Sequence, residues 1–386
     1  MLSIRVNSSW SFLIIGISIL ACQLPVSTFQ TETETAPTPT KKIEPLLPQS
    51  LYFLSDGGGD FDQVWRMEAD GSAQSQITFE PDDVVDFDVS RVDGSVVYVV
   101  NNRLFWVDAS GADRRLLVDG GEIENTDEYN YRRKIRKPLW SPDGSVVAFG
   151  QDGLVFYQLS SGTTSNPLHN EFRTLDEGLS IPTRILTPEV WSPDGMKLLY
   201  NIGYYEGSSV GVFNLSAAES IEFEDGPGCC FMAWSPDSQN FLMASPYLQY
   251  TEPGLWRYDA NNGMATTLIK GNPAAGGYNL VSYPLETVAG ELFFFYAELD
   301  QIPDGNIPMR MMRSSLEEPM AMVPMWNEAI PVYEVLWAED GSLVLIVQPV
   351  GETLAYPYRG PVLRISFAEN DSHHILVNGF NLRWGP

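Results

Sequence analysis

The stretch WSPDG at Trp140–Gly144 decides how this chain folds, because it recurs. It stands again at Trp191–Gly195, and near copies are WSPDS at Trp234–Ser238 and WAEDG at Trp337–Gly341. Trp, Ser and Asp also do chemistry, so a repeated catalytic loop is one interpretation. A catalytic loop has no need of four near copies, whereas a turn in a repeated fold does. We therefore interpret WSPDG as a turn in which Pro sets φ, the Asp side chain caps the backbone and Gly supplies a positive φ.

The motif marks an internal repeat of about fifty residues, a period typical of solenoids, arrays and propellers. Its last two positions fall at Asp93-Gly94, Asp143-Gly144, Asp194-Gly195, Asp237-Ser238 and Asp340-Gly341, with a weaker copy at Ala289-Gly290. The repeat therefore covers most of the 386-residue chain.

Each repeat has room for four short strands. Most copies are followed by two β-rich runs, such as SVVYVV at Ser95–Val100 and RLFWVD at Arg103–Asp108, and then by a more polar run such as RRLLV at Arg114–Val118. With the apolar stretch before the motif, this makes four strands, and nothing after the N-terminal segment sustains a helical period. Four antiparallel strands, repeated, are the blade of a β-propeller. We expect WSPDG to join the innermost strand to the second, with its Trp between neighbouring blades.

These residues resemble the TolB-type, WD-repeat-like propeller family. The resemblance is carried by the WSPDG turn, by the apolar strand before it, and by acidic-Gly hairpins such as VDASG at Val107–Gly111 and EADG at Glu68–Gly71. It covers Leu51 to Pro386. It implies a fold and no single activity, since that family includes scaffolds, binding proteins and domains attached to peptidases.

The two ends of the repeat region are predicted to complete one blade. LYFLSD at Leu51–Asp56 reads as a second strand with no first strand before it, and GFNLRWGP at Gly379–Pro386 reads as an apolar strand that stops at the start of a motif. Circular closure explains both and removes exposed sheet edges. We expect an all-β propeller of four-stranded antiparallel blades, closed by the C-terminal strand joining the N-terminal blade. Seven blades are predicted, with six or eight left open because Tyr278–Pro324 is irregular.

The N-terminus is predicted to be a targeting segment of the lipoprotein type. The apolar run Ser11–Leu20 is about half the length that a membrane-spanning helix needs. Ile19–Cys22 resembles a bacterial lipobox, with Cys22 as the lipidated residue; the alternative is an ordinary signal peptide cut nearby. Residues 22–50 are rich in Thr, Pro and Gln and are expected to form a disordered tether. The protein is thus expected to be exported and anchored by lipid on the extracytoplasmic side of a membrane.

Charge excludes one class of partner. The formal net charge is −27 and the pI is near 4.3, so nucleic acids would be repelled. The same balance suits a soluble protein in exposed surroundings and would permit binding of cations.

Two charged segments are candidate binding sites. DGGGDFD places Asp56, Asp60 and Asp62 in a glycine-rich loop that could hold calcium; the alternative is an acidic turn facing water. A basic run before an innermost strand should lie near the mouth of the central channel and could receive an anion or an acidic peptide. Its members are Tyr131, Arg132, Arg133, Arg136 and Lys137. The alternative is that they pair with the acidic loop Gly121–Tyr129.

Three other patterns of potentially reactive residues give weaker evidence for a functional site. Cys229 and Cys230 could form a vicinal disulfide or pack as two small apolar groups. Gly207–Gly211 matches G-x-S-x-G, but a strand rather than a helix is expected after it, which disfavours a serine hydrolase. The three histidines do not have the spacing of a zinc site.

The leading functional hypothesis is a non-catalytic binding or scaffold module for a protein, peptide or glycan, with no cofactor apart from the candidate calcium ion. One alternative is a propeller enzyme, a hydrolase or lyase, acting on an extracellular polymer. Another is an accessory subunit of an envelope complex. A convergent cluster of titratable residues at the channel would favour the enzyme, and linear order does not reveal one.

Overall fold

The computed structural model describes residues 45–123, 133–174, 180–204, 207–223, 231–246, 252–272, 276–301, 306–349, 360–367 and 373–386. The chain divides into two units, Met1–Ile43 and Glu44–Pro386, and all described residues belong to the second. Their regular elements are all strands, so the predicted all-β class is confirmed. No helix in this described part could span a membrane.

The described strands form six hydrogen-bonded sheets. The first holds β26 (Glu334–Trp337), β27 (Leu343–Val347), β28 (Gly360–Ser366), β29 (His373–Trp384), β1 (Leu51–Ser55), β2 (Gln63–Met67) and β3 (Gln74–Gln76). The second holds β4 (Asp86–Val89), β5 (Val96–Val100), β6 (Arg103–Val107) and β7 (Arg114–Asp119). The third holds β8 (Arg136–Trp140), β9 (Val146–Gly150), β10 (Gly153–Gln158) and β11 (Thr163–His169).

The fourth sheet holds β12 (Glu171–Thr174), β13 (Ser180–Trp191), β14 (Lys197–Tyr204), β15 (Gly207–Asn214) and β16 (Glu219–Phe223). The fifth holds β17 (Phe231–Trp234), β18 (Asn240–Ser245), β19 (Gly254–Asp259) and β20 (Ala265–Lys270). The sixth holds β21 (Tyr278–Glu286), β22 (Glu291–Leu299), β23 (Pro308–Ser315) and β24 (Val323–Pro324), with β25 (Ile330–Pro331) paired to β23.

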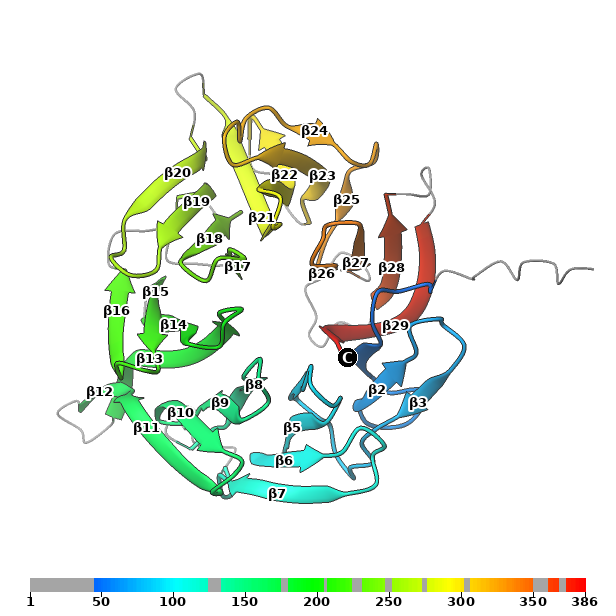
Figure 1. Ribbon diagram of the computed structural model, residues 1–386, viewed down its shortest axis with the longest axis vertical. Coiled ribbons are helices and arrows are strands. Elements are labelled where there is room, and N and C mark those ends of the chain that lie inside the picture. Colours follow the sequence, from blue (N-terminus) through cyan, green and yellow to red (C-terminus); the bar gives the residue numbers. More distant parts are fainter. Residues whose placement is uncertain are drawn as a thin grey trace, which may run out of the picture. The chain divides into compact units, whose positions relative to one another are not determined.

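The sheets stand in chain order around a central axis, as in a propeller (Figure 1). Strands such as β8, β17 and β26 lie near the axis, and β7, β11, β16 and β20 lie at the outside (Figure 1). Every strand pair is antiparallel, as predicted. Dividing the seven-stranded sheet within β29 gives seven groups of strands among the described residues. The number of blades stays a prediction.

The long strand β29 closes the ring. Its first half pairs with β28, where Gly360 faces Gly379, and its second half pairs with β1, where Leu51 faces Trp384 and Leu54 faces Phe380. One strand is therefore the outermost of the last blade and the innermost of the first. The predicted closure by the C-terminal strand is confirmed.

The WSPDG motif is a turn, as predicted. The Ser141 hydroxyl donates to Asp143 at 2.6 Å, and the backbone N–H of Gly144 donates to the carbonyl of Ser141 at 2.9 Å. Gly144 has φ +70°, a conformation that glycine adopts without steric cost. At the closure the turn is assembled from two distant segments, the residue before β1 and the residues after β29. The Gly385 N–H donates to the carbonyl of Ser50 at 2.8 Å, and the Ser50 hydroxyl donates to the carbonyl of Pro386 at 3.2 Å.

Four of the tryptophans that end innermost strands tie their blade to the preceding one. The indole N–H of Trp191 donates to the carbonyl of Leu139, at 3.3 Å. Three further indoles make the same kind of bond: Trp234 to Val190 at 3.1 Å, Trp337 to Tyr283 at 2.9 Å, and Trp384 to Trp337 at 2.7 Å. The predicted position of these side chains between blades is confirmed.

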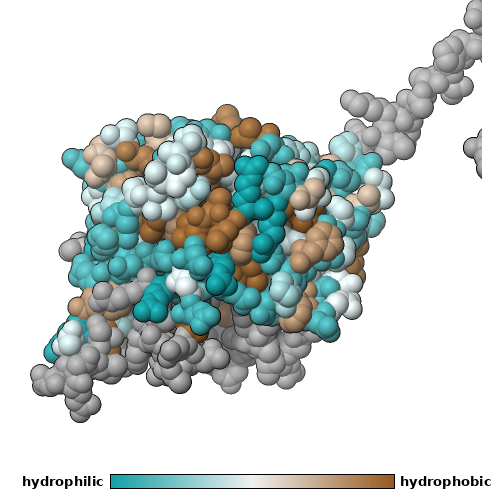
Figure 2. All heavy atoms as spheres, turned by 90° about the horizontal axis from the view of Figure 1, so that it is seen from below, coloured by the Kyte–Doolittle hydropathy of each residue, from teal (hydrophilic) through white to brown (hydrophobic). Residues whose placement is uncertain are grey.

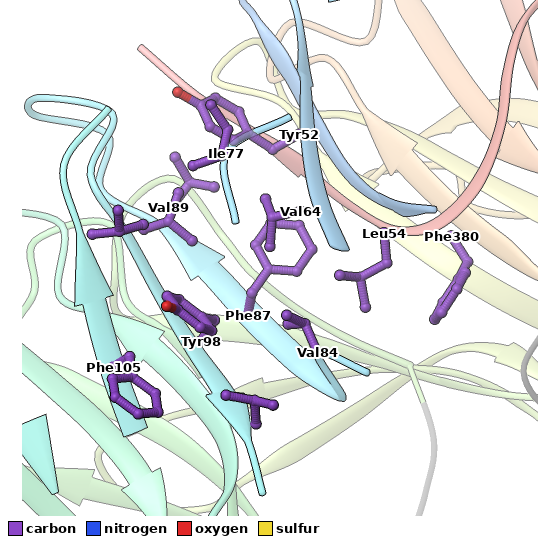
Figure 3. Close-up of a cluster of buried hydrophobic side chains, with 13 residues drawn as sticks. Tyr52, Leu54, Val64, Ile77, Val84, Phe87, Val89, Tyr98, Phe105 and Phe380 are labelled. Atoms are coloured by element: carbon purple, nitrogen blue, oxygen red, sulfur yellow. The ribbon is translucent and has the colours of Figure 1, made fainter. Parts of the chain in front are cut away.

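The hydrophobic core lies between neighbouring blades. In the cluster of Figure 3, Leu54 and Phe380 from the closing strands pack beside Val84 and Phe87 of the next blade. Phe87 is fully buried. Since each blade buries its faces against two neighbours, the ring has to close before the first and last blades bury the faces that they share.

The residues just before β1 also pack against this fold. Leu47 is buried, and its backbone N–H donates to the carbonyl of Ala69 at 2.8 Å. The Arg364 Nε donates to the carbonyl of Leu46 at 2.6 Å. These contacts reach both blades that share β29.

Deleting Phe380–Pro386 is expected to abolish cooperative thermal unfolding or soluble expression, because it removes the innermost strand of the first blade. Deleting Pro386 alone leaves every β29–β1 pair and serves as the control. Circular dichroism melting of both truncations checks this. Unchanged cooperative melting of the longer deletion would show that β29 does not close the ring.

Gly341→Ala is expected to destabilise the fold more than Gly290→Ala. Both glycines have a positive φ in equivalent turns, which costs about 1 kcal/mol for alanine. A Cβ on Gly341 would also lie 2.5 Å from the Phe293 ring of the preceding blade, whereas one on Gly290 meets nothing within 4 Å. Urea unfolding of the two variants measures the difference, and equal losses would contradict close packing at this turn.

Candidate functional site

A cluster of polar side chains lies on the innermost strands where the ring closes. Asp86 and Asp88 belong to β4, Glu334 to β26, and Asn381 and Arg383 to β29. They come from three blades that are distant in sequence. Sequence reasoning missed this cluster, because no local motif connects its members.

Glu334 is the anchor of the cluster. Its carboxylate accepts the backbone N–H groups of Asn381, at 2.7 Å, and Leu382, at 2.6 Å. The side-chain amide of Asn381 donates to Asp86 at 3.0 Å. A single carboxylate thus holds the closing strand from one side, and its neighbour Asp86 holds it from the other.

Asp88 links the closing strand to the third sheet. One carboxylate oxygen accepts the backbone N–H of Trp140 at 2.7 Å, and the other lies 3.3 Å from the Nε of Arg383. Arg383 also lies over the ring of Phe87, 5.9 Å from its centroid. These bonds make the cluster a fastening of the ring.

The environment raises the pKa of both Asp88 and Glu334. Burial raises the pKa of Asp88, opposed by Arg383 and by the N–H of Trp140. Burial likewise raises the pKa of Glu334, opposed by Arg383 and the N–H groups of Leu382 and Asn381. Raised pKa values accompany both functional acids and structural networks, so this observation alone does not assign a role.

Bulges on the innermost strands direct side chains to the next blade. Lys137, Tyr283 and Asn381 have φ of 44°, 49° and 54°, and each lies at a register shift. Lys137 forms an ion pair with Glu189, the hydroxyl of Tyr283 bonds the carbonyl of the Tyr333 backbone, and Asn381 bonds Asp86. Bulges re-aim side chains, and here they connect blades around the axis.

The basic run is only partly described. Arg136 and Lys137 lie on β8, and Lys137 pairs with Glu189 of the next blade. Most of the acidic loop that the sequence suggested as a partner lies outside the described residues, so that pairing stays a prediction. The Arg133 carbonyl accepts the side-chain amides of Asn102, at 3.1 Å, and Gln151, at 3.2 Å. Tyr131 and Arg132 lie outside the described residues, and an anion site here stays a prediction.

The three aspartates of the acidic hairpin lie within the described residues. Asp56 accepts the N–H of Gly58 at 3.0 Å, while Asp62 is buried and Asp60 is exposed. Within the described residues, which include these three, no group of three or more His, Cys, Asp or Glu side chains could hold a metal ion. Calcium binding at this hairpin stays a prediction.

The structure does not describe the cysteines at which sites are predicted. Cys22, Cys229 and Cys230 all lie outside the described residues, so lipidation and the vicinal disulfide stay predictions. Gly207–Gly211 lies wholly within β15, as expected for a sequence that is not a nucleophile elbow.

A second feature, which we name the acidic platform, consists of Asp60–Gln63 and Phe79–Val85. Gln63, only 5 % exposed, joins the two segments. Its side-chain amide donates to the carbonyls of Glu80, at 3.2 Å, and Asp82, at 3.1 Å, and accepts from the hydroxyl of Thr78, at 3.0 Å, and the N–H of Glu80, at 2.9 Å. All the bonding capacity of a buried amide thus fixes the shape of a surface loop.

The backbone adds two more connections within the platform. The N–H of Asp62 donates to the carboxylate of Asp83 at 2.7 Å, and the N–H of Val84 donates to the carbonyl of Asp62 at 2.9 Å. Val84 is buried in the core below. The platform is therefore fixed on the core between the first two blades.

A hollow of about 450 Å³ opens beside the platform. Its apolar lining comes from Phe79, Pro81, Val100 and Phe105. The polar side is occupied by Arg114, which lies 3.7 Å from the centroid of Phe105 and bonds Glu80 through two nitrogens, at 2.6 and 2.9 Å. Figure 2 looks toward the outer edge formed by β7 and shows hydrophobic residues gathered among hydrophilic ones.

Comparison with solved structures shows likeness of fold at low sequence identity. An oligogalacturonate lyase in complex with manganese has a TM-score of 0.53 and 10 % identity, over 85 % of this chain and 84 % of the lyase. A prolyl endopeptidase has a TM-score of 0.54 and 12 % identity, over 88 % of this chain and 49 % of the peptidase. This chain thus spans about half the length of that enzyme.

TolB from Acinetobacter baumannii is also similar, with 14 % identity and a TM-score of 0.41, over 79 % of this chain and 73 % of TolB. No protein-family model matches the chain, and no curated protein matches it. The sheet topology, with the likeness to the lyase and the prolyl endopeptidase, defines the class of the protein as an all-β propeller and leaves its activity open.

The free energy of unfolding of the wild-type protein, measured relative to that of Asp88→Asn, is expected to fall as pH rises from about 4 to 7. A raised pKa in the folded state means that the folded protein binds the proton more tightly than the unfolded chain, whose Asp ionises near 3.8. Stability is thus present at low pH and is lost as Asp88 ionises in the fold. Melting temperatures of both proteins across this range measure it. A difference that grows with pH would show that Arg383 dominates and lowers the pKa.

Proposed function

We propose that this protein is a non-catalytic binding module, whose ligand is a peptide, protein or glycan held at the acidic platform. The observation that supports this most is Phe79, whose side chain is 72 % exposed on a loop fixed by a buried glutamine. An exposed aromatic on a rigid loop beside a hollow is a typical anchor for a ligand.

Two further apolar residues of the platform are exposed. Phe61 is 38 % exposed and Val85 is 54 % exposed, and both lie on the two segments that Gln63 and Asp62 join. Single exposed hydrophobic residues need no explanation, whereas a cluster marks a site of interaction. Leaving a Phe side chain in water costs about 1.5–3 kcal/mol relative to burying it, and a bound ligand would recover part of this.

The axial cluster fits a structural role better than a catalytic one. Glu334 and Asp86 accept hydrogen bonds from the closing strand, and Asp88 accepts one from β8. Their carboxylates are therefore already used to hold the ring.

One observation favours a second candidate, a hydrolase or lyase that works at the axis. Burial raises the pKa values of Asp88 and Glu334, which is how buried carboxyl groups become general acids. The likeness to a lyase and a peptidase, at 10 and 12 % identity, adds only that propeller folds occur in enzymes.

The sequence of the N-terminal segment supports an extracytoplasmic location for this module. A signal peptide followed by Cys22 and a tether would display the propeller at a membrane through a lipid anchor. A module displayed in this way could also act as an accessory subunit of an envelope complex, in which case the ligand at the platform is a protein.

The full chain is expected to melt several degrees higher in the presence of one class of ligand in a panel of short peptides and cell-wall glycans. Phe79→Ala is expected to lose this shift, because it removes the exposed anchor while keeping every charge. Met264→Ala is the matched control, since Met264 is 73 % exposed on another blade. Differential scanning fluorimetry makes the measurement.

Two results would contradict the proposal. A shift that survives Phe79→Ala and disappears in Asp88→Asn would place the site at the axis and favour the enzyme. No shift with any peptide or glycan would remove the support for a peptide or glycan site at the platform.

A further inference from the structure

We infer that the acidic platform binds a cationic peptide segment that carries an aromatic or aliphatic anchor residue. This rests on the proposed binding function and adds the chemistry of the partner. The inference is supported by one hydrogen-bonded loop that holds exposed Phe79 and Val85 together with exposed carboxylates.

Charge selects a cationic partner. Asp60, Asp82 and Asp83 are all exposed on the platform. The two arginines beside it already have acidic partners: Arg114 bonds Glu80, and Arg103 lies 3.3 Å from Asp119. The surface field around the platform is therefore negative, as is the whole chain at −27, and would attract Lys and Arg side chains.

Shape selects an apolar anchor. The hollow of about 450 Å³ beside Phe79 is at the small end of the range of ligand sites, enough for one or two side chains. Phe105 and Val100 form its walls. An anchor placed there would cover Phe79, whose ring is otherwise exposed.

Rigidity favours recognition of a peptide over a purely electrostatic contact. The four hydrogen bonds of Gln63 and the bond from Asp62 to Asp83 fix the loop before any ligand arrives. A preorganised loop avoids the entropy cost of ordering on binding. Diffuse attraction of a basic molecule to an acidic protein would need no such arrangement.

Three labelled ten-residue peptides separate charge from apolar contact in a fluorescence anisotropy titration of the full chain. One alternates Lys and Leu, one alternates Lys and Ser, and one alternates Glu and Leu. We expect the Lys-Leu peptide to bind at least about tenfold more tightly than either of the others, since a buried anchor and a matching charge each contribute about this factor.

Variants locate the site. Phe79→Ala with Val85→Ser is expected to weaken binding of the Lys-Leu peptide about tenfold or more, with no change in the net charge of the protein. Met264→Ala with Val288→Ser, which alters exposed apolar residues on other blades, should leave binding unchanged.

The charge arm uses isosteric changes that keep the hydrogen-bond acceptors of the loop. Asp82→Asn with Asp83→Asn is expected to weaken the Lys-Leu peptide and to reduce the salt dependence of its binding. Glu317→Gln with Glu318→Gln removes two exposed charges elsewhere and is the control. Melting temperatures of all variants confirm that each is folded.

The outcomes are distinguishable. Equal binding of the Lys-Leu and Lys-Ser peptides, or equal effects of both acid pairs, would mean diffuse attraction and overturn the inference. Binding of the Glu-Leu peptide at Phe79 would overturn the cationic partner while leaving the proposed binding function intact. If glycans bind at Phe79 and no peptide does, the partner class is wrong; if nothing binds there, both proposals fail.

Discussion

The fold depends on one carboxylate and two backbone N–H groups. Glu334 accepts from Asn381 and Leu382, and so holds the second half of β29 beside the strands of the last blade while that half pairs with β1. Each hydrophobic cluster lies between two blades. If the ring opens, the cluster between the separated blades is therefore exposed to water. Closure is therefore the condition under which the first and last blades bury the faces that they turn toward each other.

The closure also explains where the two candidate regions lie. The axial cluster is part of the fastening, with Asp88 tying β29 to the third sheet through Trp140 and Arg383. The acidic platform rests on the core cluster that this fastening completes, through Val84 and through the bond of Tyr98 to Glu80 at 2.6 Å. A buried and hydrogen-bonded part of the ring thus supports the most exposed aromatic of the platform, which is the arrangement that a binding surface needs.

What could be predicted from the sequence was local. The WSPDG turn, the Trp contacts and the four-strand repeat follow from residues that are neighbours in the chain, and the unpaired runs at Leu51 and Gly379 predicted the closure. The axial cluster could not be found in this way, because Glu334, Asp88 and Arg383 meet only once the ring is closed. The bulges at Lys137 and Tyr283 have no residue signature, since neither type favours a positive φ. Phe79 was overlooked because FEPDD reads as an ordinary polar connection, and only the bonds of Gln63 show that it is held in place.

The contacts of Leu46 and Leu47 bear on mechanical load. The Arg364 guanidinium of the last blade donates a hydrogen bond to the carbonyl of Leu46. The carbonyl of Ala69 in the first blade accepts one from the N–H of Leu47. Tension applied at Pro45 would therefore be divided between two blades before it reached β1. A protein held from its N-terminal side could be pulled there without unzipping the strand that its ring needs most.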